Sequence, residues 1–234
     1  MAAVGFDFDH TLGIDNKLER VAFLRLLELL ISVGGKPLGS LQQETVAIDE
    51  LLTLQRSGAF SIGEAVERFC AARLPHTDVA PYVSTYKQFA IAGVEQFVIP
   101  MPGARAMLQT LRRMGVRTAI LTNGWSPLQE CKAARIGFDG PVVVSETIGV
   151  QKPAPAAFEA LAKALGVQAD ELWYVGDNPA ADVAGSIASG LKGVWLDAEA
   201  LAYPAELTPP SAVIHSLDAL PALLEANRGS AALA

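Results

Sequence analysis

The chain has 234 residues, of which 51% are hydrophobic, enough for one sizeable core and a smaller module. A formal net charge of −7 and the lack of any Lys/Arg run argue against a nucleic-acid-binding surface. The most apolar stretch, residues 21–31, contains Arg25 and Glu28 and is shorter than the roughly 20 apolar residues that span a bilayer. We therefore expect a soluble, cytoplasmic protein with no nucleic-acid or membrane partner.

The first part of the chain predicts one strand followed by helices. Residues 2–8 are apolar and β-compatible, and they end in a polar cluster. Helices are expected next near residues 17–33, 41–55, 61–72 and 78–94. Ser61 and Glu64 have the spacing of a capping box, which supports the start of the third helix. A Pro/Gly-rich break at residues 100–103 then ends this helical insertion.

Strands and helices alternate after the break. Strands are expected at residues 116–121, 141–144, 172–175, 193–196 and 212–214. Helices are expected at residues 104–114, 127–135, 155–165, 180–189 and 217–226. This alternation predicts an α/β fold with a doubly wound, mostly parallel sheet covered by helices on both faces. An apolar run such as residues 118–121 fits a strand that is buried on both sides.

Four polar clusters follow expected strands and carry the residues that suggest chemistry. In chain order they are Asp7-Phe8-Asp9-His10-Thr11, Leu121-Thr122-Asn123-Gly124, Gln151-Lys152-Pro153-Ala154-Pro155 and Val175-Gly176-Asp177-Asn178-Pro179-Ala180-Ala181-Asp182. In open α/β sheets, ligands bind outside the carboxyl ends of the strands. We therefore expect the four clusters to converge in space although they lie far apart in the sequence.

The first and fourth clusters supply acids. Asp7 and Asp9 are expected to point to the same side of a strand, because the side-chain period of a strand is two. Two carboxylates that close repel each other unless a cation lies between them or one carries a proton. Asp177 ends a hydrophobic strand, and Asp182 falls in the first helical turn, where the helix dipole alone also favours an acid. Taken alone, the first pair is equally well interpreted as solvated acids at a strand end.

The second and third clusters supply groups that suit anions. The Thr122 hydroxyl, the Asn123 amide and the flexible backbone at Gly124 are suited to an oxyanion, although a plain strand-to-helix turn is the simpler interpretation of this cluster alone. Lys152 precedes a helix that begins at Pro155, and its ammonium is a compact charge suited to phosphate. Taken alone, a solvated lysine is again the simpler interpretation.

Together, the order of the clusters and their positions after strands resemble the haloacid dehalogenase-like hydrolase superfamily, from residue 4 to about residue 197. The matching motifs are Asp7-x-Asp9-x-Thr11, Thr122, Lys152 and Gly176-Asp177-x-x-x-x-Asp182. The helical insertion resembles the cap of the subfamily whose cap falls between the first two motifs. His10 stands where glycine is commonest in the family, and we expect this to affect only how the cap approaches.

The resemblance implies a Rossmann-like core catalytic domain, residues 1–14 and 100–228, and an inserted α-helical cap domain, residues 15–99. It implies a Mg²⁺-dependent phosphatase that hydrolyses a small phosphorylated metabolite through an aspartyl-phosphate. Asp7 would be the nucleophile and Asp9 the acid and base. The groups that hold the phosphate would be Thr122, Asn123 and Lys152. The metal ligands would be Asp7, Asp9 through its backbone carbonyl, Asp177 and Asp182.

Two alternatives remain open. A phosphomutase of the same superfamily would use Asp7 but return the phosphoryl group to a second sugar hydroxyl. A phospho-acceptor module like a response-regulator receiver also carries acids, a Thr and a Lys at strand ends, but it is shorter and has no helical insertion. Asp9 argues against dehalogenation, because a departing halide needs no proton. Either a monomer or a homodimer is expected. Any single basic residue of the cap is most simply interpreted as a solvated helix residue, and the candidates for reaching the substrate are Arg20, Arg25, Arg56, Arg68, Arg73, His76 and Lys87.

Overall fold

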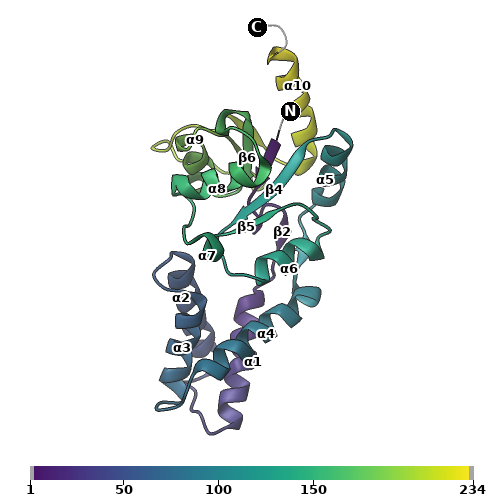
Figure 1. The fold of residues 1–234 in the computed structure, drawn as a ribbon. Coiled ribbons are helices and arrows are strands. Elements are labelled where there is room, and N and C mark those ends of the chain that lie inside the picture. Colours follow the sequence, from purple (N-terminus) through teal and green to yellow (C-terminus); the bar gives the residue numbers. More distant parts are fainter. Residues whose placement is uncertain (1–2, 232–234) are drawn as a thin grey trace. The chain divides into compact units, whose positions relative to one another are not determined.

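The protein, seen in a computed structural model, is described over residues 3–231, with side chains through residue 227. The chain divides into two compact units (Figure 1). One unit comprises Met1–Ile14 and Ile99–Ala234, and the other comprises Asp15–Val98. The first is an α/β unit, and the second is built from helices.

The α/β unit is built on a six-stranded sheet in the order β5-β4-β1-β6-β7-β8 (Figure 1). Its strands are β1 (Ala3–Phe6), β4 (Arg117–Thr122), β5 (Val142–Val144), β6 (Leu172–Gly176), β7 (Lys192–Leu196) and β8 (Ala212–Ile214). Each pair of neighbours in this order is parallel. The chain builds β4 and β5 on one side of β1 before it returns to build β6, β7 and β8 on the other. The topological switch, where open α/β sheets bind ligands, therefore lies beside β1.

The helices of this unit cover both faces of the sheet. They are α5 (Ala104–Arg113), α6 (Leu128–Arg135), α7 (Ser145–Ile148), α8 (Pro155–Leu165), α9 (Gly185–Ala188) and α10 (Leu220–Ala231). Figure 1 shows α8 and α9 on one side of the sheet and α5 on the other. This follows from the switch, because right-handed crossovers in opposite directions place their helices on opposite faces. The prediction of a doubly wound α/β fold is confirmed.

The α8 face of the sheet is close-packed at its centre. Phe158 and Leu161 of α8 are fully buried in a cluster with residues of β1, β4 and β6. A side chain on Gly5 of β1 would meet Leu161 at 2.4 Å, so the missing Cβ allows α8 to lie directly on the central strand. This packing holds α8, and the loop before it, against the strands that carry the first and fourth clusters.

Two sequence-based boundaries of this unit were wrong. The first strand was expected over residues 2–8, but β1 ends at Phe6 (residue 2 lies outside the described part). The Phe8 carbonyl accepts the backbone N–H groups of Thr11, Leu12 and Gly13, so the chain turns instead of extending. The helix expected at residues 180–189 is a π-helical turn, Pro179–Ala184, followed by the short α9.

The chain leaves the α/β unit after β2 (Gly13–Ile14) and returns to it at β3 (Ile99–Pro100), and these two short strands form a two-stranded ribbon. The strands pair antiparallel, with Gly13 opposite Pro100. The sequence did not predict this ribbon, because two-residue strands carry no periodic signal. The pairing brings together the two ends of the helical insertion.

The helical unit contains α1 (Leu18–Ser32), α2 (Leu41–Arg56), α3 (Ile62–Arg73) and α4 (Ala80–Phe97). Capping boxes start α2 at Ser40 and α3 at Ser61. The Phe23 ring lies 4.9 Å from the Phe69 ring and 4.4 Å from the Tyr86 ring, which forms an aromatic core. These contacts join α1, α3 and α4 into one bundle.

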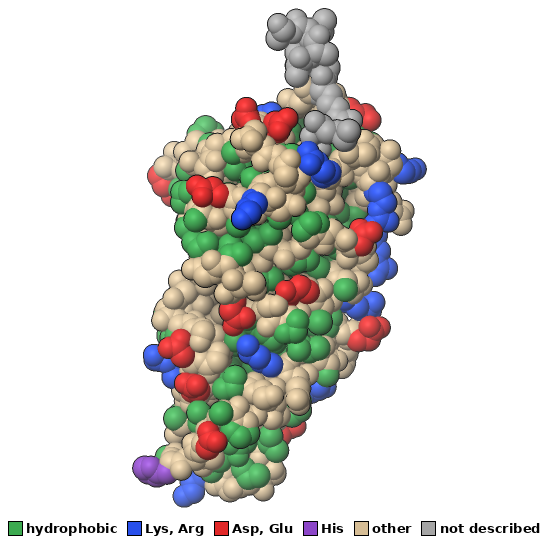
Figure 2. All heavy atoms as spheres, viewed as in Figure 1, with side chains coloured by type: hydrophobic (Ala, Val, Ile, Leu, Met, Phe, Trp, Pro, Cys, Tyr) green, Lys and Arg blue, Asp and Glu red, His purple; other side chains and the backbone are tan. Residues whose placement is uncertain are grey.

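Arg73 of α3 is buried and forms an ion pair with Glu44 of α2. Arg73 is therefore neither a solvated helix residue nor a candidate for reaching a substrate, because its charge is paired inside the helical unit. Among the described helices, none combines the length and apolar character needed to cross a membrane. On the face shown in Figure 2, Lys and Arg side chains are interspersed with Asp and Glu.

Candidate active site

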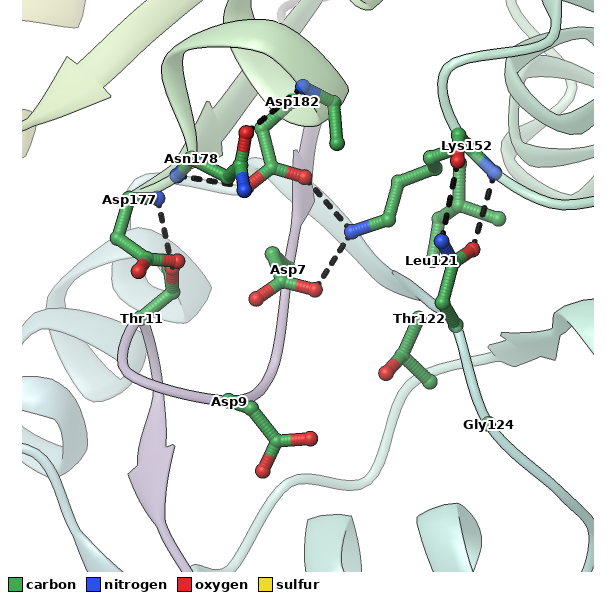
Figure 3. Close-up of polar contacts among 12 residues, drawn as sticks. Asp7, Asp9, Thr11, Leu121, Thr122, Gly124, Lys152, Asp177, Asn178 and Asp182 are labelled. Atoms are coloured by element: carbon green, nitrogen blue, oxygen red, sulfur yellow. Dashed lines mark hydrogen bonds and ion pairs between the residues drawn. The ribbon is translucent and has the colours of Figure 1, made fainter. Parts of the chain in front are cut away.

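Three neighbouring strands end at the candidate active site (Figure 3). Asp7 directly follows the central strand β1, and its backbone N–H donates to the carbonyl of Val175 on β6 at 2.9 Å. Thr122 is the last residue of β4, and Asp177 directly follows β6. The structure brings Asp7, Lys152 and Asp182 into direct contact, which joins the first, third and fourth clusters.

Lys152 is the centre of this constellation, and its side chain is only 4% exposed. Its Nζ donates to Asp7 Oδ1 at 2.6 Å, to Asp182 Oδ1 at 2.7 Å and to the Tyr174 hydroxyl at 2.9 Å. An ammonium has three protons to donate, so all of them are used. Burial by itself lowers the pKa of Lys152, but the carboxylates of Asp182 and Asp7 more than offset this and raise it well above its usual value. The interpretation as a solvated lysine is wrong.

The backbone around Lys152 is held by Asn123. The Asn123 side-chain Nδ2 donates to the Lys152 carbonyl at 3.1 Å, and the Lys152 N–H donates to Asn123 Oδ1 at 2.9 Å. The Asn123 amide thus joins the second cluster to the third. Because the side-chain amide of Asn123 is engaged with Lys152, its backbone N–H is the group that is left for a contact with phosphate.

Tyr174 supports the same lysine from the middle of β6. Its buried hydroxyl accepts from Lys152 Nζ and donates to the Leu121 carbonyl at 2.8 Å. The sequence analysis missed this residue, because a tyrosine in a strand is explained by β propensity alone. Only the packed sheet shows that its hydroxyl lies beneath Lys152.

Three carboxylates lie close together at this site, and two of them contact Lys152. One oxygen from each of Asp7, Asp177 and Asp182 lies within 4.8 Å of the others. Burial, reinforced by Asp182 and Asp9 and opposed by Lys152, raises the pKa of Asp7 to about 7. Burial and Asp7 likewise raise the pKa of Asp177 to about 6. Because the site holds more negative than positive charge, its acids fit a hard divalent cation such as Mg²⁺.

Asp182 has donors on both of its oxygens. Its Oδ1 accepts from Lys152 Nζ, and its Oδ2 accepts from the Asn178 N–H at 3.0 Å. A Cβ at Gly176 would lie 2.4 Å from the Asp182 carboxylate, which explains why a glycine ends β6. Burial raises the pKa of Asp182, while Lys152 opposes this rise. These contacts favour a part for Asp182 in orienting Lys152 over direct binding of a metal.

Thr11 connects the first loop to the fourth cluster. Its buried hydroxyl donates to Asp177 Oδ1 at 3.3 Å and accepts from the Asp177 N–H at 3.1 Å. The neighbouring His10 has a φ of +61°, in the left-handed region that glycine adopts freely and histidine adopts more often than most residues. The backbone shape of this loop therefore gives a physical reason for the preference for glycine at this position.

Asp9 lies apart from the three clustered acids. Because β1 ends at Phe6, the period of a strand does not set its direction, and Figure 3 shows its carboxylate extending away from Asp7. Its Oδ1 lies 2.5 Å from the Nζ of Lys132, a buried residue of α6.

Helix α6 also contacts the second cluster. The Thr122 hydroxyl donates to Gln129 Oε1 at 3.4 Å, and a side chain at Gly124 would meet the Gln129 amide at 2.4 Å. The sequence analysis missed both Gln129 and Lys132. The signal was present, because two polar residues three positions apart occupy one face of a helix that directly follows the second cluster.

One protein family matches most of this chain. The profile of the family described as haloacid dehalogenase-like hydrolase covers residues 1–190. The chain belongs to the haloacid dehalogenase-like hydrolases. The predicted membership is thereby confirmed, and the protein is a hydrolase of this family.

Relatives of this hydrolase include several phosphatases. It is 31% identical to a glyceraldehyde 3-phosphate phosphatase of Methanopyrus kandleri over 81% of each chain. It is 39% identical to a phosphoserine phosphatase of Thermus thermophilus, over 41% of this chain and 40% of that protein. It is 34% identical to the pyrimidine 5'-nucleotidase YjjG of Escherichia coli, over 56% of this chain and 60% of that protein. The chain thus matches less than two thirds of the length of the last two.

Solved structures share the fold of this hydrolase. The HAD-hydrolase YfnB from Bacillus subtilis bound to magnesium superposes with a TM-score of 0.69 and 24% identity, covering 95% of this chain and 98% of that one. A 2-haloacid dehalogenase from Pseudomonas syringae pv. Tomato DC3000 superposes with a TM-score of 0.72 and 24% identity, over 96% and 99%. At this identity the likeness establishes the fold, and the chemistry has to be argued from the site.

Proposed function

We propose that this HAD-like hydrolase is a Mg²⁺-dependent phosphatase that hydrolyses a small phosphate monoester through an aspartyl-phosphate on Asp7. The observation that carries the proposal is the position of Asp7 itself. Its carboxylate contacts the fully bonded Lys152 and shares a 4.8 Å cluster with Asp177 and Asp182. A nucleophile that contacts a fixed cation and lies within a cluster of acids suits phosphoryl transfer, where catalysis is mainly positioning and charge neutralisation.

In the first step, formation of the aspartyl-phosphate, each residue of the site has a separate role. Asp7 attacks phosphorus, and the bond to the leaving oxygen breaks. Lys152 offsets charge on Asp7 and on the phosphoryl oxygens, and the Thr122 hydroxyl with the backbone N–H of Asn123 holds those oxygens. Asp9 gives its proton to the departing alkoxide. Asp182 and Tyr174 keep Lys152 in place through their contacts with Nζ.

In the second step, Asp9 takes a proton from the water that hydrolyses the aspartyl-phosphate, which returns Asp9 to its starting state. Asp7 and Asp177 would hold Mg²⁺, with the Asp9 carbonyl and Asp182 as further candidates. When bound, Mg²⁺ supplies positive charge against the clustered carboxylates and the phosphoryl oxygens. The raised pKa values of Asp7 and Asp177 support this, since such acids gain most from a cation.

The helical unit, residues 15–98, is proposed to act as the cap that selects the leaving group, while the α/β unit carries the chemistry. The likeness to phosphatases acting on several different metabolites supports a small phosphorylated substrate without naming one. One structural neighbour is a dehalogenase, but Asp9 argues against dehalogenation here. A departing alkoxide needs a proton from an acid, whereas a departing halide does not.

The proposal is tested by p-nitrophenyl phosphate hydrolysis, with and without Mg²⁺, by the wild type, Asp7→Asn and the matched control Asp170→Asn. Asp170 is exposed on the surface of the α/β unit, so its variant should behave as wild type. We expect Mg²⁺-dependent hydrolysis that Asp7→Asn abolishes. Hydrolysis that survives in Asp7→Asn would contradict the nucleophile assignment.

Product analysis separates the alternatives. A phosphoryl group recovered on a second hydroxyl of a hexose phosphate would indicate a mutase. A long-lived phosphoprotein without phosphate release would indicate an acceptor module, and halide release from a 2-haloacid would indicate a dehalogenase.

A further inference from the structure

Lys132 is a buried cation outside the four polar clusters. It forms an ion pair with Asp9, the proposed acid and base, which lies outside the group of residues around Lys152. The Lys132 side chain is 2% exposed, whereas that of its partner Asp9 is 35% exposed. Its Nζ lies 2.5 Å from Asp9 Oδ1 and 5.1 Å from the centre of the Phe8 ring. The ammonium thus approaches the first loop both through the acid and through the aromatic ring beside it.

The helix that carries Lys132 is itself held at its start. The Glu130 carboxylate accepts from the Ser126 hydroxyl at 2.6 Å, and the Gln129 N–H donates to the Trp125 carbonyl at 3.3 Å. Gln129, three positions before Lys132 and on the same face, contacts Thr122. One helix therefore reaches both the hydroxyl at the end of β4 and the acid of the first loop.

A half-exposed carboxyl on a loop needs such support if it is to work as a proton donor. Loop side chains sample several rotamers, and displacement of a catalytic group by about 1 Å can cost about 100-fold in rate. A buried lysine whose stem is packed has few alternatives of its own, so an ion pair to it restricts the acid. The deeply buried Asp7 and Asp182 do not need this, because Lys152 and the sheet already hold them.

We propose that Lys132 is a positioning residue that holds the Asp9 carboxyl where it exchanges a proton with the leaving group. The inference rests on the proposed phosphatase function and deepens it. Asp9 gives one proton to the leaving oxygen and later takes one from water, while Lys132 keeps all three of its protons throughout. Lys132 therefore affects the reaction only through the place it gives to Asp9.

This role has a specific kinetic signature in the leaving group. An alkoxide needs a proton as it departs, whereas 2,4-dinitrophenolate is a stable anion that departs without one. We compare kcat/KM, which covers the steps up to formation of the aspartyl-phosphate, for an alkyl monoester that the wild type hydrolyses and for 2,4-dinitrophenyl phosphate. In Lys132→Met we expect a loss of about 100-fold or more for the alkyl ester, the lower end of general-acid contributions, and of less than about 5-fold for the aryl ester.

Three controls separate positioning from folding. Lys132→Arg keeps the cation and should recover at least about 10-fold of the alkyl-ester rate. Lys163→Met, which removes an exposed lysine of α8, should match wild type on both esters. In the double variant Asp9→Asn with Lys132→Met, the loss should equal that of Asp9→Asn alone, because both changes remove the same contribution. Circular dichroism on each variant checks that the compared proteins are folded.

This inference would be overturned by equal losses for the two esters in Lys132→Met, or by a double variant whose loss is the product of the two single losses. Neither result would contradict the proposed phosphatase function. If Lys132→Met does not fold, the comparison is made in Lys132→Arg and Lys132→Gln, with the same expectation of a larger loss for the alkyl ester in Lys132→Gln. A wild type that hydrolyses neither ester overturns the proposed function, and this inference with it.

Discussion

Both units of the chain bury an ion cluster, and the two clusters differ in their balance of charge. In the helical unit, Arg73 and Glu44 pair one cation with one anion, and their side chains are 3% and 1% exposed. In the α/β unit, Lys152 contacts Asp7 and Asp182 directly, and Asp177 lies in the same group of acids. The first cluster is neutral, whereas the second carries an excess of negative charge.

The neutral ion pair of Arg73 and Glu44 has a structural role. The Arg73 guanidinium also donates to the Phe69 carbonyl at 2.9 Å and lies 3.6 Å from the centre of the Phe69 ring. The Arg73 carbonyl accepts the Lys36 N–H at 2.8 Å, and Glu44 accepts the Leu38 N–H at 2.5 Å. The pair therefore holds the connection between α1 and α2 against α3, and its charges are satisfied without any ligand.

The acid-rich cluster is not satisfied in the same way. The pKa values of Asp7 and Asp177 are raised to about 7 and about 6, because burial and repulsion between the acids outweigh the single lysine. Buried charge alone therefore does not indicate a functional site. An excess of buried negative charge, with acids whose pKa values are raised, indicates a site where a cation or a reacting group is expected.

The largest effect is expected from Lys152→Met. It removes the only ammonium in contact with Asp7 and Asp182 in the described part of the chain, together with the charge proposed to face the phosphoryl oxygens. Loss of one such group costs about 100- to 1,000-fold in kcat. Steady-state hydrolysis of p-nitrophenyl phosphate measures it, and a variant with wild-type kcat would remove Lys152 from the proposed mechanism.

Arg73→Met tests the other side of the comparison. It leaves Glu44 as a buried, unpaired charge, so we expect the free energy of unfolding to fall by about 3–5 kcal/mol while kcat of the folded protein is unchanged. Urea denaturation followed by circular dichroism measures the first, and hydrolysis at low temperature measures the second.

A matched control for Arg73→Met is the exposed pair of Arg112 and Asp139, whose side chains are 63% and 72% exposed. Arg112→Met should cost less than about 1 kcal/mol, because water screens such a pair. If the two arginine variants were equally stable, burial of the Arg73 pair would not matter as argued.

A smaller effect is expected from Mg²⁺, and it should depend on pH. The ordinary pKa of an Asp carboxyl is 3.8, and folding raises it to about 7 at Asp7 and about 6 at Asp177, so the metal-free folded protein binds more protons than the unfolded chain between these limits. Their contribution to stability is therefore complete below about pH 4 and is lost as the pH rises through about 6 to 7. At about pH 8 we expect Mg²⁺ at 100 times its Kd to raise the free energy of unfolding by about 2.7 kcal/mol, and at about pH 5 by much less, because protons compete for the same oxygens.

Denaturation with and without Mg²⁺ at the two pH values measures this dependence, with sodium chloride of equal ionic strength as the control for screening. Asp177→Asn should lose most of the Mg²⁺-dependent gain, whereas Arg73→Met should keep it. A gain that is the same at both pH values, or unchanged in Asp177→Asn, would argue against a cation bound by these acids.

The amino-acid sequence was enough to predict the α/β alternation, the helical insertion and the order of the four polar clusters. Apolar runs such as residues 118–121 and the breaks at residues 100–103 carry that information locally. The topology rule then predicted that Asp7, Lys152 and Asp182 would meet, and the structure brings them into contact. The same local signals did not predict the end of β1 at Phe6, because the turn depends on backbone hydrogen bonds within the loop.

The side chains that support the site could be identified only from the packed structure. Tyr174, Gln129 and Lys132 look ordinary in the sequence, and Lys132 lies 123 positions from Asp9. Arg73 looked like a solvated helix residue, yet packing of α3 against α2 buries it beside Glu44. Such contacts join residues on different elements, and their side-chain directions are set by how those elements pack. Periodicity and spacing describe one element at a time, so they carry no record of these partners.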